Sequence, residues 1–559
     1  MIKFYKSIVK ISSTLLNLIA IIFALDLFSH LIQTDFEIWI NFSKIGLILL
    51  GFHNIVYLIR KKKRINRLIS IIPDLIFITI GFTIQGSEKV FEFYLMGRQT
   101  FLLIKNMSIS SKKETLFDTL SKNPPVFVLF SFLLAIFTGT LLLLLPAATV
   151  INETTTLIGA LFTSTSATCV TGLIVYDTGS HFTIFGQLII LLLLQIGGLG
   201  IMTISSAFAI MVGQKLTLRS EHLIQNVVGE SNKIDMFSLM ENIIVITVFF
   251  ELIGAILLFF SFKNDFYTFK ETLYHSVFHS ISAFCNAGFS LYSDNMMKFR
   301  SVFNVNFVIT FLIIIGGIGF PVIDDFRRKF LLRKKRSKLS LHTKIVIVST
   351  ILLISIGFAG YFITEYNNEM KGFELKDRVF ASYFQSVTTR TAGFNTIDNA
   401  NLTSASAFIS LILMFIGASP GSTGGGVKTT TFFIIVLSVF ALLSGNSDVN
   451  IFKRKVSNEI IRKVMALIAI SLTLLSFMIF LLLIIEPYSA KKIIFEAFSA
   501  FGTVGLSMGI TANLSDFGKV IIVLLMYLGR VGPLTLVFAI SETKIKTTYS
   551  YTEEKISIG

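Results

Sequence analysis

The chain has 559 residues, of which 53% are hydrophobic and only 15% charged, and its formal net charge is +16. Soluble domains carry about 25% charged residues, so this composition excludes an ordinary soluble protein and indicates a polytopic helical membrane protein. The positive charge does not indicate a nucleic-acid partner, because the basic residues lie in short runs between apolar stretches. Such runs mark cytoplasmic loops and contacts with anionic membrane lipid.

Residues 1–110 are predicted to form an N-terminal transmembrane extension. Stretches near 8–28, 38–59 and 68–86 reach membrane-spanning length, and the less apolar stretch 89–105 is a candidate for a fourth, spanning or interfacial, helix. The basic-then-apolar N-terminus lacks a clear cleavage site, so we expect the first stretch to be retained as a helix.

Further apolar stretches follow along the rest of the chain. Runs of basic residues at 60–64, 327–338 and 453–455 assign the loops that contain them to the cytoplasmic side. Both termini are therefore expected in the cytoplasm, with the chain crossing a plasma or inner membrane many times. The predicted spans are 125–147, 183–211, 242–262, 302–323, 343–364, 403–416, 431–444, 462–485 and 517–541.

Four glycines mark a repeated unit in this part of the chain. Gly172, Gly288, Gly393 and Gly505 are separated by 116, 105 and 112 residues. An aromatic residue lies ten positions before each glycine, and a large apolar residue follows each one directly. A second glycine landmark reads IGG, IGG, IGA and LGR in the four copies. Matching offsets of this kind predict four copies of one structural unit.

Each unit is predicted to contain a spanning helix, a short semi-polar helix that ends at the glycine, and a second spanning helix. The short segments are too short to cross a bilayer, so we expect them to be re-entrant. Irregular backbone at membrane depth is tolerated only where protein buries it or a watery cavity is present, so the four loops should surround one cavity. The predicted fold class is an all-α polytopic membrane protein with four M1–P–M2 repeats and pseudo-fourfold symmetry around one pore.

The repeat also predicts the organisation of the chain after the N-terminal extension. We number the four copies as pore units 1 to 4. They cover 115–235, 236–340, 341–455 and 456–545, with a gating loop at 418–431 inside unit 3 and a cytoplasmic tail at 546–559.

The residues around the four glycines are typical of an ion filter made from backbone. Inward-pointing carbonyls can replace the hydration shell of a cation, and glycine adopts positive φ values without a side-chain penalty. One such glycine alone would be read more simply as a helix-packing contact, but four at matching positions favour a filter. The candidate filter residues are Cys169, Val170, Thr171 and Gly172; Asn286, Ala287 and Gly288; Thr391, Ala392 and Gly393; and Thr503, Val504 and Gly505.

Unit 3 contains a glycine-rich interruption, ASPGSTGGGVKTTT, at 418–431. Proline and glycine break a helix, so this stretch is predicted to be a flexible loop below the filter that opens or blocks the cavity. It fails the nucleotide-binding P-loop pattern, because Lys428 comes one place late and no strand precedes the loop. The candidate gating residues of the loop are Gly421, Gly424, Gly425 and Gly426.

Arg530 is the other candidate gating residue, since it stands where the other units have Gly198, Gly317 and Ala418. A charge in the middle of a membrane helix costs about 2.5–3.5 kcal/mol on insertion scales, so the side chain should face water or a partner. We expect it to face the pore, where it would repel cations or hold the gating loop through carbonyl groups. The alternative is an arginine that snorkels to the cytoplasm.

Isolated histidine, cysteine and arginine residues give weaker signals. His275 and His279 lie one helical turn apart without a third ligand, so we expect them to line a short helix rather than bind zinc. Cys169 and Cys285 each lie three residues before a filter glycine and are expected to pack behind the filter without a disulfide. Arg390 has the same offset in unit 3 and is a candidate to pair with a carboxylate behind the filter.

The four loops resemble the pore loops of the Ktr/Trk/HKT superfamily of K⁺ transporters, and within it the KtrB-like membrane subunits of bacterial Ktr systems. The resemblance covers about residues 115–545. It implies K⁺ as the ion at the four filter glycines and a gating loop in unit 3. Serine at the first filter glycine goes with Na⁺ preference in plant relatives, so Gly172 favours K⁺. The segments that carry the resemblance are TSTSATCVTGLIVYDT, AFCNAGFS, TTRTAGFNTID and FSAFGTVGLSMG.

The resemblance further implies a homodimer that sits on a cytoplasmic ring of RCK (KtrA-like) nucleotide-binding subunits. This chain has no Rossmann fingerprint, so nucleotide control would come from such a partner. The predicted function is K⁺ uptake through a gated pore, with Na⁺ dependence allowed and no covalent cofactor. The first alternative is a secondary cation transporter with inverted repeats. The second, a membrane-embedded enzyme, lacks a catalytic constellation in this sequence.

Overall fold

The computed structural model describes residues 124–151, 153–211, 236–263, 268–331, 339–446 and 448–532. The predicted extension at 1–110, the predicted tail at 546–559 and the basic residues 332–338 lie outside the described residues. The described part is built from helices, together with a small hairpin of β1 (Asn450–Ile451) and β2 (Arg454–Lys455) that contains the basic run 453–455.

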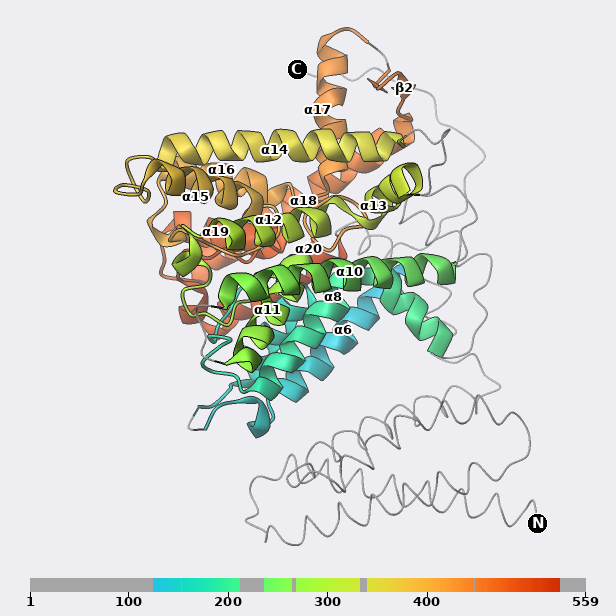
Figure 1. Ribbon diagram of the computed structural model, residues 1–559. Coiled ribbons are helices and arrows are strands. Elements are labelled where there is room, and N and C mark those ends of the chain that lie inside the picture. Colours follow the sequence, from blue (N-terminus) through green and yellow to red (C-terminus); the bar gives the residue numbers. More distant parts are fainter. Residues whose placement is uncertain are drawn as a thin grey trace, which may run out of the picture. The chain divides into compact units, whose positions relative to one another are not determined.

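The helices follow one another in four successive sets of the same order: a long helix, a short helix and an apolar helix that is bent or broken in three of the sets (Figure 1). The first set is α6 (Pro124–Leu143), α7 (Leu157–Thr168) and α8 (Ile184–Met211). The second is α10 (Met236–Phe262), α11 (Phe269–Phe284), α12 (Phe303–Ile318) and α13 (Phe320–Phe326). The third is α14 (Leu341–Glu365), α15 (Leu375–Thr388), α16 (Ser404–Phe415) and α17 (Thr429–Leu443), and the fourth is α18 (Asn458–Ile485), α19 (Ala490–Gly502) and α20 (Asp516–Val531).

Short helical turns lie between these helices. The 3-10 turns are η1 (Pro146–Ala148), η2 (Met297–Phe299), η4 (Asn399–Asn401) and η5 (Thr511–Asn513), and η3 (Arg327–Leu331) is a π-helical turn that continues α13.

The short helix of each set cannot cross a bilayer alone. α7, α11, α15 and α19 contain 12, 16, 14 and 13 residues, whereas a spanning helix needs about 20. Threonine caps start α7 and α11, because the side chains of Thr156 and Thr268 accept hydrogen bonds from backbone N–H groups of the first turn. Each short helix ends just before a predicted filter glycine, as the sequence predicts.

The apolar helices after the filters differ from the predicted continuous spans. α8 is kinked at Gly200 (φ 79°), and α12 and α13 meet at Gly319 (φ 94°) with a bend of 97°. In the fourth set, α20 ends at Gly532 (φ 89°). The interruption that the sequence predicts only for unit 3 therefore has counterparts in the other units. The physical reason is a glycine with positive φ, which departs from helical geometry without a side-chain penalty.

These breaks reduce the number of helices that can cross a membrane unaided. Within the described residues, three helices have the required length and composition, or up to four if the bent pair of α12 and α13 forms one span. The three are Glu241–Phe262, Leu341–Glu365 and Asn458–Ile485. Predicted spans such as 183–211, 403–416 and 431–444 are thus shorter or interrupted helices, and the protein combines full crossings with half-length segments.

Apolar clusters join each set of helices to the next one. Burial of these large side chains supplies the packing that holds neighbouring sets together. The buried pairs come from α8 and α11, from α12 and α15, and from α16 and α19. They include Leu193 with Phe278, Leu312 with Phe384, and Met414 with Phe495.

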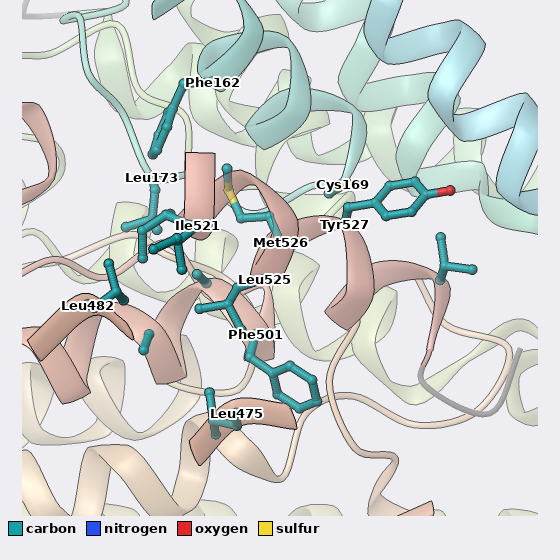
Figure 2. Packing of buried hydrophobic residues seen from close by; sticks show 14 of the residues in the cluster. Phe162, Cys169, Leu173, Leu475, Leu482, Phe501, Ile521, Leu525, Met526 and Tyr527 are labelled. Atoms are coloured by element: carbon teal, nitrogen blue, oxygen red, sulfur yellow. The ribbon is translucent and has the colours of Figure 1, made fainter. Parts of the chain in front are cut away.

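The last set packs against the first, so that the chain closes on itself. One buried cluster contains Phe132 and Phe162 of the first set together with Leu525 of α20. Figure 2 shows Phe162 beside residues of the red helices of the fourth set. The Tyr527 hydroxyl of α20 donates a hydrogen bond of 2.9 Å to the carbonyl oxygen of Leu129 in α6. The four sets therefore contact one another in the cyclic order first, second, third, fourth, first.

Candidate functional site

The four predicted filter glycines lie next to one another, although more than a hundred residues of sequence separate each from the next. A side chain added to any of them would collide with the backbone of the following unit, at the residue directly before its filter glycine. The contacts run in one direction and close into a ring. Gly172 faces the carbonyl oxygen of Ala287, Gly288 faces that of Ala392, Gly393 faces that of Val504, and Gly505 faces that of Thr171.

Each filter segment contains two residues with left-handed backbone angles. One is the glycine, with φ between 68° and 95°, and the other is the residue two positions before it. A regular extended strand turns successive carbonyls to opposite sides, whereas a segment with alternating backbone conformations can aim them to one side. The non-glycine residues with positive φ are Val170 (57°), Asn286 (60°), Thr391 (73°) and Thr503 (51°).

The sequence predicts these residues as part of the filter but not their backbone angles, since valine and threonine rarely adopt positive φ. Their common offset from the glycine is the only signal that points to them. The predicted filter residues are buried, apart from the half-buried Gly505.

Hydroxyl groups on the short helices hold the filter segments from behind. In units 1 and 4, Ser166 and Ser499 accept hydrogen bonds of 3.1 Å from the backbone N–H groups of the filter glycines. In unit 2, Ser282 donates a bond of 2.8 Å to the carbonyl oxygen of Phe289. Thr388 makes the corresponding bond in unit 3, at 2.6 Å to Phe394. In unit 3 the supporting hydroxyl thus lies five residues before the filter glycine, one position later than the serine of the other units.

The glycine-rich loop of unit 3 lies against the filter segments. The N–H group of Gly425 donates a hydrogen bond of 3.1 Å to the Thr503 hydroxyl, and a side chain on Gly424 would collide with that of Thr391. Thr423 reaches the end of α11, where its hydroxyl donates a bond of 3.1 Å to the carbonyl oxygen of Phe284. The loop therefore contacts units 2, 3 and 4 at the ends of the short helices.

The loop also joins the bends of the neighbouring apolar helices. Ser419 donates a backbone hydrogen bond of 3.0 Å to Gly317, and Gly421 accepts one of 2.9 Å from Phe320, just after the bend at Gly319. Within the loop, Val427 forms an isolated parallel bridge: its N–H group donates to the carbonyl oxygen of Phe415 at 3.3 Å, and its carbonyl oxygen accepts from the Gly417 N–H at 2.9 Å. The interruption is thus an ordered structure in this state, held by backbone hydrogen bonds and by burial of Val427 in an apolar cluster.

Arg530 lies beneath the filter and contacts the glycine-rich loop. The side chain is 8% exposed, and its guanidinium donates hydrogen bonds to the carbonyl oxygens of Thr423 in the loop and Gly197 in α8. Lys428 donates a bond of 2.8 Å to the carbonyl oxygen of Gly424. In the part of the chain that the structure describes, neither cation forms an ion pair with a carboxylate. Two positively charged side chains therefore lie near the loop, and both donate hydrogen bonds to backbone carbonyl oxygens.

The cysteine and histidine residues that gave weaker signals in the sequence are buried or half-buried in the protein. Cys169 and Cys285 are buried free thiols, and the Cys285 sulfur lies 3.4 Å from the Gln195 side-chain oxygen. His279 lies on α11 and contacts the carbonyl oxygen of His275 at 2.7 Å.

The expected carboxylate partner of Arg390 is not present among the described residues. Instead, the side chain lines a small cavity with Ile314, Ile354 and Ala418, and its Nε atom has no hydrogen-bond partner. The residues of α12 and α14 that line this cavity are isoleucines, Gly317 and Thr350, none of which carries a carboxylate, so the prediction of an ion pair is wrong.

Comparisons with known proteins agree with this arrangement of helices. The family model of TrkH cation transport proteins matches residues 95–546. The chain is 41% identical to Ktr system potassium uptake protein B of Bacillus subtilis (strain 168), over 80% of this chain and 99% of that protein. It is 38% identical to the protein of the same name in Vibrio alginolyticus, over 79% of this chain and 96% of that protein. It is 36% identical to the potassium/sodium uptake protein NtpJ of Enterococcus hirae, over 77% of this chain and 95% of that protein.

Among solved structures, the potassium transporter TrkH from Vibrio parahaemolyticus has the same fold, with a TM-score of 0.64 at 17% identity over 90% of this chain and 98% of that one. These matches confirm the resemblance to KtrB-like subunits and a multi-pass helical membrane protein that transports ions and is not an enzyme. The chain belongs to the TrkH family of cation transport proteins.

Proposed function

We propose that this chain forms a K⁺ uptake pore, in which backbone carbonyls of four filter segments replace the hydration shell of the ion. The observation that carries the proposal is the ring of contacts between each filter glycine and the residue before the next one. Any side chain at these glycines would fill the space between neighbouring carbonyls. A ring of peptide oxygens offers a cation partial negative charge without the strong binding of a carboxylate ring, so that the ion can also leave.

The choice of K⁺ rests on two further observations. The relatives from Bacillus subtilis and Vibrio alginolyticus are named for potassium uptake, and the first filter position is Gly172 rather than serine. The short helices end next to the filter, and the partial negative charge of a helix C-terminus favours a cation there. One relative is named for potassium and sodium uptake, so stimulation of K⁺ uptake by Na⁺ belongs to the same proposal.

The four units surround one pore with pseudo-fourfold symmetry in this proposal. The cyclic order of the apolar clusters supports it, because the fourth set of helices packs against the first. The domain limits predicted from the repeat belong to the same proposal. The alternating-access mechanism of a transporter with inverted repeats needs two halves of opposite orientation. The sequential contact of four similar sets favours a pore instead.

The gate consists of the glycine-rich loop at 418–431 and Arg530. In the state described, the loop lies against Thr391 and Thr503 at the inner end of the filter, and Arg530 holds it through the Thr423 carbonyl. Its glycines, Gly421, Gly424, Gly425 and Gly426, allow the loop to move aside. The charges of Arg530 and Lys428 raise the electrostatic barrier for a cation below the filter as long as the loop stays in place.

Control of the gate comes from cytoplasmic partners in this proposal. The protein forms a homodimer that sits on a ring of RCK nucleotide-binding subunits. Basic segments at 327–338 and 452–463, with the C-terminal tail, are the proposed docking surfaces. A shift of the ring would be transmitted to the loop through α17, which begins at Thr429 in the C-terminal end of the loop segment.

Reconstituted protein in liposomes tests the transport proposal. We expect K⁺ flux down its electrochemical gradient that exceeds Na⁺ flux, and complementation of a bacterial strain deficient in K⁺ uptake. Gly172→Ser should lower the K⁺ to Na⁺ ratio, because the added side chain would meet the Ala287 carbonyl. Equal fluxes of the two ions in the wild type, or a ratio unchanged by this substitution, would contradict the proposal.

A further inference from the structure

At one corresponding position of the short helices, a buried polar residue lies behind each filter, and its type differs among the units. The position lies nine residues before the filter glycine in units 1, 2 and 4. In unit 3 it lies eight residues before, because the supporting hydroxyl is also shifted by one. The residues are Thr163, His279, Gln385 and Glu496, and all four are at most 1% exposed.

Glu496 makes more hydrogen bonds to the segment after its own filter glycine than any other residue of this group. One carboxylate oxygen accepts a hydrogen bond of 2.6 Å from the Ser507 hydroxyl and one of 2.9 Å from the Met508 backbone N–H. The other oxygen accepts a bond of 2.9 Å from the Thr511 hydroxyl. All three donors belong to the segment that follows the filter glycine Gly505.

The other units have weaker versions of this connection or none. In unit 2, the His279 Nε2 atom accepts from the Leu291 N–H at 3.3 Å and contacts the Ser290 hydroxyl at 3.1 Å. In unit 3, Gln385 donates one bond of 2.7 Å to the Asn399 side chain. In unit 1, Thr163 bonds only to the carbonyl oxygen of Gly159 in its own helix. The filter segment of unit 4 is therefore the one most strongly tied to its short helix.

We infer that Glu496 is a positioning residue that sets the ion selectivity of the pore by fixing the backbone on the outer side of the unit 4 filter. The inference rests on the proposed K⁺ pore. The Gly505 N–H is bonded to Ser499 of α19, and Met508 is bonded to Glu496 of the same helix. The segment from Gly505 to Met508 is thus attached at both ends to one rigid helix. These attachments limit how far the carbonyl groups of the filter segment can shift toward a smaller ion.

Hydrogen bonds rather than the negative charge carry this role. A buried carboxylate is tolerated in a membrane protein when its oxygens accept several hydrogen bonds, as here. Glutamine at this position keeps an acceptor oxygen for Ser507 and Met508. Its NH₂ group can donate to the Thr511 hydroxyl, which then accepts this hydrogen bond instead of donating it. Alanine removes all of these bonds.

Glu486 offers a matched control in the same unit. It is 5% exposed and accepts bonds from the Ser515 N–H and hydroxyl, at 3.0 and 2.6 Å. Ser515 is the N-cap of α20, so this carboxylate fixes the start of a helix and not the filter segment. Its loss should lower stability without a direct effect on the filter.

The test compares K⁺ and Na⁺ fluxes in proteoliposomes for the wild type, Glu496→Gln, Glu496→Ala and Glu486→Ala. For Glu496→Ala we expect the K⁺ to Na⁺ flux ratio to fall by about tenfold. Glu496→Gln should stay within about threefold of the wild type. Glu486→Ala should keep the wild-type ratio and unfold at a lower temperature. If Glu496→Ala does not fold, Thr511→Val and Ser507→Ala together remove the hydroxyl partners and should also lower the ratio.

Three results would overturn the inference. They are a wild-type ratio in Glu496→Ala or in the double variant, an equal loss of selectivity in Glu486→Ala, and a glutamine variant as unselective as the alanine variant. The last would assign the effect to the charge. A wild-type protein without K⁺ selectivity would instead refute the proposed pore, so the two failures are distinguishable.

Discussion

The filter and the region directly below it differ in how strictly the four units repeat. At the filter, all units have a glycine with positive φ, a second residue with positive φ two positions earlier, and a carbonyl that faces the preceding unit. Below it, the corresponding residues are Gly198, Gly317, Ala418 and Arg530, and within the described residues only one unit has a long non-helical loop in this place. The proposed function accounts for this difference: backbone that surrounds one ion would be alike on every side, whereas a gate would need its blocking parts only once.

The repeated region should be the more sensitive to substitution. Gly288→Ala places a methyl group 2.6 Å from the Ala392 carbonyl oxygen, at a residue with φ 68°. Left-handed angles alone cost an alanine about 1–2 kcal/mol, and the collision moves a filter carbonyl. We expect K⁺ flux in liposomes to fall by at least about tenfold.

Gly372→Ala is the matched control for this substitution. Its φ of 89° is similar, but nothing lies within 4 Å of the added methyl group. This variant should lose about 1 kcal/mol of stability and keep its flux. Equal loss of flux in both variants would show that backbone strain, not the ring of contacts, causes the effect.

The unrepeated region should respond in the opposite direction. Deletion of residues 420–426 removes the segment that lies against Thr391 and Thr503, so K⁺ flux without cytoplasmic partners should rise several-fold, by about tenfold at most. The measurement is K⁺ flux per folded protein in liposomes. An unchanged or lower flux in a well-folded deletion variant would contradict a blocking role.

Arg530→Ala should have a smaller effect of the same sign. It removes the hydrogen bonds to Thr423 and Gly197 and one positive charge from the ion path, but leaves the loop in the chain. We expect the K⁺ flux of Arg530→Ala to rise about threefold. The flux of Arg530→Lys should lie between those of the wild type and Arg530→Ala, because a lysine keeps the charge but not the planar pair of donors. A loss of flux in a folded Arg530→Ala protein would indicate that the arginine supports the open state.

The closure between the first and fourth sets should contribute stability without affecting ion choice. Tyr527→Phe removes the hydrogen bond to the Leu129 carbonyl at the helix contact shown in Figure 2. We expect a loss of about 0.5–1.5 kcal/mol in unfolding free energy, measured in detergent, and an unchanged K⁺ to Na⁺ ratio. A changed ratio would mean that this helix contact is coupled to the filter.

Sequence alone predicted the features that depend on residue type. A ring of close backbone contacts admits only glycine, so Gly172, Gly288, Gly393 and Gly505 were recognisable from their spacing. The broken helix of unit 3 was also predictable, because proline and clustered glycines rarely continue a helix.

The missed features depend on tertiary structure. The bends at Gly200 and Gly319 were not predicted, since single glycines are common in continuous membrane helices. The comparison of IGGLG, IGGIG and LGRVG would have revealed them, because each has a glycine two positions after the landmark. The partners of Glu496 could not be deduced, because eleven or more residues of sequence separate it from them.

In the proposed pore, the carbonyl groups before the four filter glycines surround a dehydrated K⁺. Crystals grown with Tl⁺ in place of K⁺ would test it most directly, through the anomalous scattering of the bound ion. We predict a peak at the centre of the ring formed by residues 171, 287, 392 and 504, with comparable distances to the four carbonyl oxygens. Bound Tl⁺ elsewhere in the protein and none within this ring would contradict the account.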